Sequence, residues 1–233
     1  MKKNVSKKSQ IWLITTGFSC NNNCVMCSVK PMRESCSDRM TDEIVKDFET
    51  GRKLGYNQVG LTGGEPTIRS DIGCLIGTAK KLGYLKIGLN TNARRLSYGD
   101  FCEELVKSGL NKIIFTINGS DRQMFDAITD TPGAFSQTVQ GVKNILGYPG
   151  IEVIANTVVF KMNYRCLTEI RKFISRLGVK SWHLLDLIPD GSAKEIYPTA
   201  AVPMTKLSRG LNHLAQNTVD FGKIAFFDFP LCL

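Results

Sequence analysis

The sequence contains no long hydrophobic run, and this absence argues against a membrane-spanning helix. Such a helix needs roughly 20 consecutive apolar residues, and no stretch of the 233 residues approaches that length. The chain also shows no internal repeat, no low-complexity segment and no change of composition that would mark a domain boundary. Because 42% of its residues are hydrophobic, it can bury a sizeable core, and we expect one large domain over residues 11–228.

Cysteine is too sparse for a disulfide scaffold, since only eight cysteines occur in the whole chain. This usage is typical of a reducing compartment and predicts a cytoplasmic protein. Three of the cysteines lie within residues 20–27. The other five are expected to be small buried apolar residues rather than ligands: Cys36, Cys74, Cys102, Cys166 and Cys232.

The chain is basic, with a formal net charge of +9. Part of this charge lies in a basic N-terminal tail, residues 1–10, which contains four lysines: Lys2, Lys3, Lys7 and Lys8. The basic residues are not interleaved with aromatic ones, so the sequence does not favour nucleic acid as a partner. A solvated basic surface is the simplest interpretation, and docking of an acidic electron carrier or an acidic peptide is the alternative.

Short apolar segments alternate with segments in which apolar residues recur at helical spacing. Six segments are predicted to be strands, each followed by a helix: 11–16, 58–62, 85–90, 112–117, 151–160 and 181–188. Residues 223–227 are a candidate for a further strand, Ser97 with Asp100 predicts a capping box, and Pro132-Gly133 predicts a helix break. The alternation predicts an α/β fold with a parallel sheet. It leaves open whether that sheet is doubly wound or curved into a closed or partial barrel.

Cys20, Cys24 and Cys27 are separated by three and by two residues. On a short loop this spacing lets three thiolates hold three corners of an iron–sulfur cube. A fourth cysteine normally completes such a site, and none lies at a matching distance, so one iron would stay open. One alternative is a zinc site with a distant fourth ligand. Another is an export signal, because residues 1–10 are basic, 11–18 are apolar and Cys20 follows, although such a signal would not require the later two cysteines.

A second polar segment, Gly63-Gly64-Glu65-Pro66, directly follows a predicted strand. Its glycines can adopt backbone angles that are closed to other residues, which would expose N–H and C=O groups to a ligand. Glu65 adds a carboxylate. By itself the segment is also compatible with an ordinary tight turn. Because reactive groups of α/β barrels gather at the carboxyl ends of the strands, its position favours a binding role.

The cysteine spacing, followed 36 residues after Cys27 by the Gly-Gly-Glu-Pro segment, resembles the radical S-adenosylmethionine (SAM) enzymes. The resemblance implies a partial TIM barrel, the (β/α)6 radical SAM core. It also implies a [4Fe-4S] cluster on the three clustered cysteines, whose open iron binds SAM. In such enzymes one electron splits SAM, and the resulting 5′-deoxyadenosyl radical abstracts hydrogen from a substrate. The family segment that holds the amino group of SAM corresponds here to Gly63, Gly64 and Glu65.

Polar residues near the ends of later strands resemble the SPASM/twitch branch of this family, which includes peptide-modifying enzymes and the molybdenum-cofactor cyclase. Thr116 and Asn118 stand where that branch has Ser-x-Asp-Gly. Asn156 matches the branch's strand asparagine, and Asn92 lies in Thr-Asn-Ala, which is similar to the family's Thr-Asn-Gly. The resemblance implies that Asn92, Thr116 and Asn156 bind SAM. The alternative is that each asparagine merely caps a loop.

Two residues depart from the family pattern. Met26 stands where the family commonly has an aromatic residue beside the adenine, and its polarisable side chain can still pack there. Ala93 replaces the glycine of Thr-Asn-Gly, which weakens the match at the third strand.

The sixth predicted strand carries two titratable residues, His183 and Asp186, of opposite parity. Only one of them can therefore face the barrel lumen. We expect His183 to be hydrogen-bonded by a neighbouring backbone group and Trp182 to lie in the core. No catalytic residue is assigned.

The resemblance predicts the substrate only by class. It favours modification of a peptide or protein, or cofactor maturation, with a flavodoxin- or ferredoxin-type reductant as partner. A small metabolite or tRNA as substrate, and a non-catalytic iron–sulfur protein that transfers electrons, are the alternatives. The branch usually carries a cysteine-rich C-terminal region with auxiliary clusters, and residues 229–233 lie where such a region would begin. The sequence therefore suggests a truncated chain, with Cys232 as a candidate ligand of an auxiliary cluster.

Overall fold

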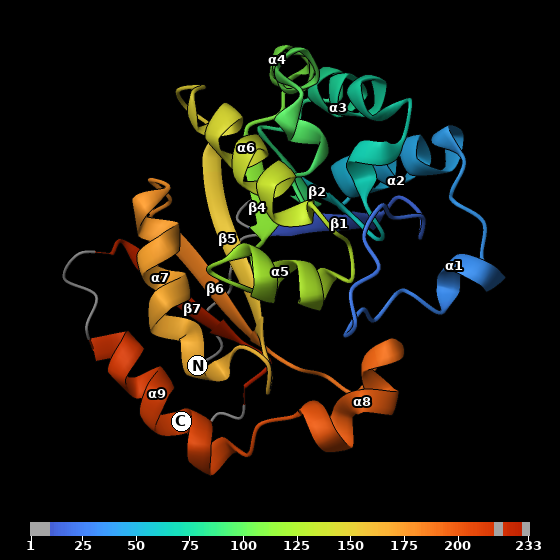
Figure 1. The fold of residues 1–233 in the computed structure, drawn as a ribbon. Helices are drawn as coiled ribbons and strands as arrows, with labels where there is room; N and C mark the ends of the chain where they lie inside the picture. The colour runs from blue at the N-terminus through green and yellow to red at the C-terminus, as the bar shows by residue number, and fades with distance from the viewer. Residues whose placement is uncertain (1–9, 217–220, 230–233) are drawn as a thin grey trace, which may run out of the picture.

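Seven parallel strands form one curved sheet in the computed structural model, which describes residues 10–216 and 221–229 (Figure 1). In chain order the strands are β1 Ile11–Thr15, β2 Gln58–Thr62, β3 Lys86–Thr91, β4 Lys112–Thr116, β5 Glu152–Val159, β6 Ser181–Asp186 and β7 Lys223–Phe227. Each strand pairs with the next one along the chain. A doubly wound sheet would reverse its strand order at one point, and this sheet does not. The partial barrel is therefore confirmed, and residues 223–227 form a seventh strand.

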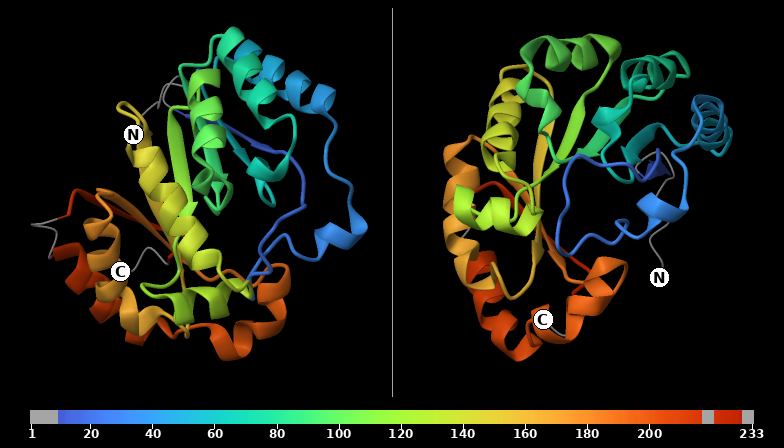
Figure 2. Two further views of the ribbon diagram at one scale, coloured as in Figure 1. Left: turned by 45° about the horizontal axis from the view of Figure 1, so that its top comes forward. Right: turned by 45° about the vertical axis from the view of Figure 1, so that its right-hand side comes forward.

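In chain order the described helices are α1 Met32–Ser35, α2 Thr41–Lys53, α3 Ile72–Lys81, α4 Gly99–Ser108, α5 Arg122–Thr129, α6 Ala134–Leu146, α7 Leu167–Arg176, α8 Ser192–Ala200 and α9 Met204–Gln216. Most of these helices cover the outer side of this half-barrel, whereas α1 and α8 lie near the segment that carries Cys20, Cys24 and Cys27 (Figures 1 and 2). The predicted break at Pro132-Gly133 is confirmed, because it separates α5 from α6. In the described ranges, no helix is long and apolar enough to cross a membrane.

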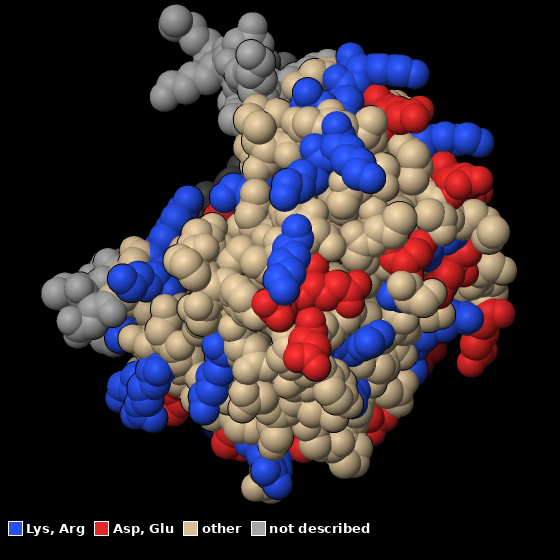
Figure 3. All heavy atoms as spheres, turned by 90° about the horizontal axis from the view of Figure 1, so that it is seen from above, with Lys and Arg blue, Asp and Glu red and all other residues tan. Residues whose placement is uncertain are grey.

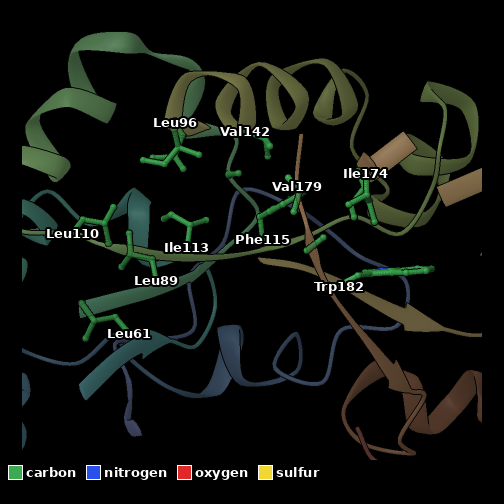
Figure 4. Packing of buried hydrophobic residues seen from close by; sticks show 14 of the residues in the cluster. Leu61, Leu89, Leu96, Leu110, Ile113, Phe115, Val142, Ile174, Val179 and Trp182 are labelled. Carbon is green, nitrogen blue, oxygen red and sulfur yellow. The ribbon is translucent and has the colours of Figure 1, made fainter. Parts of the chain in front are cut away.

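Strand residues alternate between the helices and the lumen. Leu61, Leu89, Ile113 and Phe115 are fully buried on the outer face, where they pack under side chains of the helical layer (Figure 4). The intervening residues face the lumen, and among them Leu13 is 59% exposed. The core therefore lies between sheet and helices, and the concave side of the sheet stays open.

The lumen holds a cavity of about 420 Å³ near the amino ends of the strands, which we call the lumen cavity. Gly60 pairs with Gly88 across β2 and β3, and two adjacent positions without side chains widen the lumen there. Apolar side chains supply much of the remaining wall: Ile11, Leu13, Val59, Ile114, Leu185 and Phe227. Lys86 and Lys112 lie at its far end, and both form ion pairs with Glu152, at 3.0 and 3.3 Å.

Two local expectations are wrong. Ser97 does not cap α4, because it ends a short 3₁₀ helix, Arg95–Ser97, and the N-cap position of α4 is Tyr98 without a side-chain hydrogen bond. Of the five scattered cysteines, Cys102 alone of those described is buried, and Cys36 and Cys74 are exposed. Cys74 lies off the buried side of α3, which carries Ile72, Leu75, Ile76 and Ala79, and Cys36 is the C-cap of α1, which buries no residue. Cys232 lies outside the described residues.

Charged side chains of both signs lie interspersed on the face seen from above in Figure 3. On this face the basic residues do not gather into one large patch, despite the net charge of +9. Trp182, expected in the core, is fully buried, and its Nε1–H donates to Thr157 Oγ1 at 2.9 Å.

Candidate functional site

The segment that carries Cys20, Cys24 and Cys27 leaves the carboxyl end of β1 and crosses the top of the half-barrel. Its backbone is held from two sides. The N–H groups of Asn23 and Val25 donate to carbonyls at the end of α5, both at 3.0 Å. The carbonyl of Cys27 accepts from the N–H at the start of α8, at 3.1 Å. These contacts fix the loop without using any of the three thiols.

The Gly-Gly-Glu-Pro segment packs directly against the approach to Cys20. Gly64 N–H donates to the carbonyl of Gly17 at 2.9 Å, and Glu65 N–H donates to that of Ser19 at 2.8 Å. A Cβ on Gly64 would lie 2.1 Å from the Ser19 oxygen, a distance that real contacts do not reach. Gly63 has a φ of +123°, which favours glycine. The loop therefore requires both glycines. The N–H groups of Gly64 and Glu65 donate to carbonyls of the protein rather than to a ligand.

Glu65 is 3% exposed, and its carboxylate accepts four hydrogen bonds from protein donors. Thr67 donates through its N–H at 3.0 Å and its hydroxyl at 2.5 Å. The Thr91 hydroxyl and the Asn92 N–H each donate at 2.6 Å. Burial raises the pKa of Glu65, while the hydrogen bonds from Thr67, Thr91 and Asn92 act in the opposite direction. This side chain joins the end of β2 to the end of β3.

Asn92 continues the connection from β3 to the cysteine loop. Its Nδ2 donates to Asn21 Oδ1 at 2.6 Å and lies 3.9 Å from Cys20 Sγ. Arg94, which the sequence analysis did not single out, donates to the carbonyl of Asn21 and to Asn22 Oδ1, the latter at 2.9 Å. Local pattern offers no signal for these bonds, because they join residues more than 70 positions apart.

Ala93 occupies the position where the family has glycine, and it has a left-handed φ of 61°. Such a conformation costs a non-glycine residue roughly 1–2 kcal/mol. The turn is held by the Ala93 N–H, which donates to Thr91 Oγ1 at 3.0 Å, and by the Arg94 N–H, which donates to Asn92 Oδ1 at 3.0 Å. The alanine therefore keeps the turn at an energetic cost.

A cavity of about 350 Å³, which we call the upper cavity, lies under the cysteine loop at the carboxyl ends of the strands. Its wall includes every residue that the sequence analysis assigned to cluster or SAM: Cys20, Cys24, Cys27, Gly63, Gly64, Glu65, Asn92, Thr116 and Asn156. The structure brings these together from five separate segments. Met26 also lines this cavity and packs in a small apolar cluster with Phe160 and Leu187.

Two amide atoms in the wall of the upper cavity are buried without a hydrogen-bond partner among the described residues, Asn118 Nδ2 and Asn156 Oδ1. The other end of the Asn118 amide is used, since its Oδ1 accepts from Val158 N–H at 2.9 Å. Unpaired buried polar atoms are rare in proteins. One donor and one acceptor thus remain for a polar ligand such as SAM, and the wall fits such a ligand.

The three clustered thiols are reduced and partly buried. Burial raises the pKa of Cys24 to about 12 and also raises the pKa of Cys20, while the Arg33 charge acts against both shifts. In the described part of the chain no three His, Cys, Asp or Glu side chains are arranged to hold a single metal ion. That finding concerns a single ion, whereas a cubane takes each thiolate at a different iron. Thiolate donors suit iron–sulfur clusters.

His183 and Asp186 lie apart, as their parity predicts. His183 lines the lumen cavity, and its ring lies 4.8 Å from that of Phe227. Within the described residues this ring contact replaces the backbone hydrogen bond that the sequence analysis expected. Asp186 borders neither the upper nor the lumen cavity, and its Oδ1 accepts from the Leu187 N–H at 2.9 Å.

Comparison with known proteins places this site in context. The model of the Radical SAM superfamily matches residues 14–174. A probable GTP 3′,8-cyclase of Saccharolobus solfataricus is 30% identical over 181 residues, which cover 78% of this chain and 58% of the relative. One of Sulfolobus acidocaldarius is 28% identical over 199 residues, or 85% and 62%. The chain thus spans about 60% of the length of these curated relatives.

Solved structures share the fold at low identity. Streptococcus suis SuiB bound to its precursor peptide SuiA superposes with a TM-score of 0.77 at 18% identity, covering 93% of this chain and 48% of SuiB. SuiB bound to S-adenosylmethionine gives 0.76 at 17%, covering 95% and 50%. The structure described as native anSMEcpe with bound AdoMet gives 0.70 at 16%, covering 93% and 64%.

Proposed function

Because this chain belongs to the radical SAM superfamily and is an enzyme of that type, we propose that it cleaves SAM reductively in its upper cavity and passes the radical to a substrate in the lumen. One observation carries this proposal. Three thiols, the Gly-Gly-Glu-Pro segment and two unpaired amide atoms line the same cavity of about 350 Å³. No other cavity described above combines thiols with unpaired polar atoms.

The family implies both groups that the chemistry needs. A [4Fe-4S] cluster on Cys20, Cys24 and Cys27 would supply one electron, and SAM would supply the 5′-deoxyadenosyl radical. The chain itself supplies position. Glu65 fixes Asn92 against the cysteine loop, and Asn118 and Asn156 offer one donor and one acceptor to the polar parts of SAM. The lumen cavity shares Ile114, Asn156 and Leu185 with the wall of the upper cavity, so a substrate there would lie next to SAM.

The substrate is proposed as a peptide or protein side chain, and the apolar lumen wall supports an uncharged group at the reacting position. Lys86 and Lys112 in that wall share one ion-pair partner, Glu152, and a polyphosphate would have to compete with this carboxylate for them. A GTP 3′,8-cyclase activity is the second candidate, favoured by the names of the curated relatives. Addition of GTP to the reduced enzyme with SAM separates the two, because only a cyclase would form 5′-deoxyadenosine faster with GTP than without it and convert the GTP.

The proposed site is tested by anaerobic reconstitution with iron and sulfide. Wild type should take up a [4Fe-4S] cluster, change its electron paramagnetic resonance (EPR) spectrum when SAM is added, and form 5′-deoxyadenosine with dithionite. Cys24→Ala should lose all three properties. Cys74→Ala is the matched control, since Cys74 is an exposed thiol far along the chain, and it should behave as wild type.

Three results would contradict the proposal. Reductive SAM cleavage by Cys24→Ala at the wild-type rate would exclude the cysteine site. A cluster whose spectrum ignores SAM would indicate four protein ligands and favour a non-catalytic iron–sulfur protein that transfers electrons. A colourless protein that binds zinc instead would exclude both.

A further inference from the structure

Arg33 lies six residues after Cys27, on the short helix α1, and its guanidinium turns back toward the cysteine loop. Its Nη1 donates to the carbonyl of Asn22 at 2.8 Å. Its Nη2 lies 3.8 Å from Cys27 Sγ, within the range of a hydrogen bond to sulfur. Arg33 also lines the upper cavity. One side chain thus touches both the backbone of the loop and a predicted cluster thiolate.

The guanidinium of Arg33 has a further hydrogen-bond donor that no described residue uses. Arg33 Nε is buried and has no hydrogen-bond partner among the described residues. Within those residues Arg33 also forms no ion pair with an aspartate or glutamate. An arginine carries five N–H donors in a fixed plane, and leaving one buried and unpaired costs free energy. Further hydrogen-bond acceptors in the cavity beside Cys27 would satisfy this unpaired N–H group of Arg33.

Arg94 provides the internal comparison, because it contacts the same loop. It donates to the carbonyl of Asn21 and to Asn22 Oδ1, and its Nε donates to Gln137 Oε1 at 2.6 Å. These acceptors are oxygens of the protein, and Arg94 does not line the upper cavity. Two arginines therefore hold one loop, and of the two only Arg33 lies against a thiol.

We propose that Arg33 is a positioning residue that raises the reduction potential of the [4Fe-4S] cluster. This inference rests on the proposed cluster site. Cluster potentials depend on net charge and on hydrogen bonds to the sulfurs. Reduction adds one negative charge to a cluster already held by three thiolates, and a fixed cation that donates to those sulfurs stabilises the reduced form more than the oxidised one. Arg33 thereby eases the transfer of the electron that SAM cleavage requires.

The proposal is tested by redox titration of the reconstituted cluster without SAM, followed by EPR, together with iron content and thermal unfolding. Arg33→Gln removes the charge and should lower the equilibrium constant for reduction about tenfold, a shift of about 59 mV to more negative potential for one electron. Arg33→Lys keeps the charge but loses the Nε donor, so its reduction potential should lie between those of the wild type and Arg33→Gln. Arg94→Gln loosens the same loop and should keep the wild-type potential.

Each outcome decides the matter. An Arg33→Gln protein with full iron content and the wild-type potential would overturn the inference, as would an equal shift in Arg94→Gln. If Arg33→Gln fails to fold or to load, Arg33→Lys decides: a more negative potential supports the role and an unchanged one overturns it. A wild-type protein that takes up no [4Fe-4S] cluster would overturn the proposed function and this inference with it.

Discussion

The two sides of the upper cavity differ in how fully their polar groups are hydrogen-bonded. On the side of β2 and β3, the Glu65 carboxylate has four protein donors, and Asn92 and Arg94 bond to the cysteine loop. On the side of β4 and β5, Asn118 Nδ2 and Asn156 Oδ1 are buried and unpaired in the described structure. The contrast teaches that one side is built to hold the loop, and the other keeps its hydrogen-bonding capacity for a ligand. Substitutions on the two sides should therefore affect different quantities.

The largest effect is expected from Glu65→Ala. It leaves buried donors of Thr67, Thr91 and Asn92 without their acceptor, and each unsatisfied group costs about 1–3 kcal/mol. We expect the free energy of unfolding to fall by about 3 kcal/mol, as measured by urea denaturation. The exposed Glu104→Ala is the control and should change it by less than about 0.5 kcal/mol. Equal stability of the two variants would remove the distinction between the two sides.

Asn156→Ala should affect binding rather than folding. Because Asn156 Oδ1 has no protein partner in the described structure, its removal should change the free energy of unfolding by less than about 1 kcal/mol. One lost hydrogen bond of about 1 kcal/mol should weaken SAM binding to the reconstituted protein about fivefold, as titrated by the EPR change. Asn57→Ala is the matched control, since Asn57 Oδ1 is likewise buried and unpaired but lines neither the upper nor the lumen cavity. If Asn156→Ala lowered the free energy of unfolding but bound SAM with wild-type affinity, Asn156 would stabilise the fold as Glu65 does, and the contrast between the two sides would be contradicted.

The smallest effect is expected from Glu152→Gln, which changes the carboxylate that pairs with Lys86 and Lys112 at the far end of the lumen cavity. Burial acts to raise the pKa of Glu152, but Lys86 and Lys112 outweigh it and hold that pKa below its usual 4.5. A lowered pKa stabilises the folded state above pH 4.5, and this contribution is lost as the pH falls through the folded value. Glu152 is 40% exposed, so Glu152→Gln should cost less than about 1 kcal/mol at pH 7. Urea denaturation should show this difference shrinking below pH 4.5, and a difference that grows there would contradict the sign.

Much of the fold follows from local pattern, because strand alternation and helical periodicity depend on neighbours in sequence. The strand ends also identify the polar residues that line the upper cavity. The sequence could not show that the Glu65 carboxylate would accept a hydrogen bond from Asn92, or that Arg33 and Arg94 would donate hydrogen bonds to the cysteine loop. Those contacts depend on which loops meet in space. The assignment of cluster and SAM residues stays a prediction until ligands are bound.

The close packing of Gly64 against the carbonyls of Phe18 and Ser19 constrains how the two segments can evolve. A methyl group there would push the backbone that leads into the first cysteine outward, so neither stretch can accept substitutions independently of the other. Relatives that alter one stretch should carry a compensating alteration in its neighbour. An engineer who grafts the cysteine loop onto another barrel would need to transplant both pieces together.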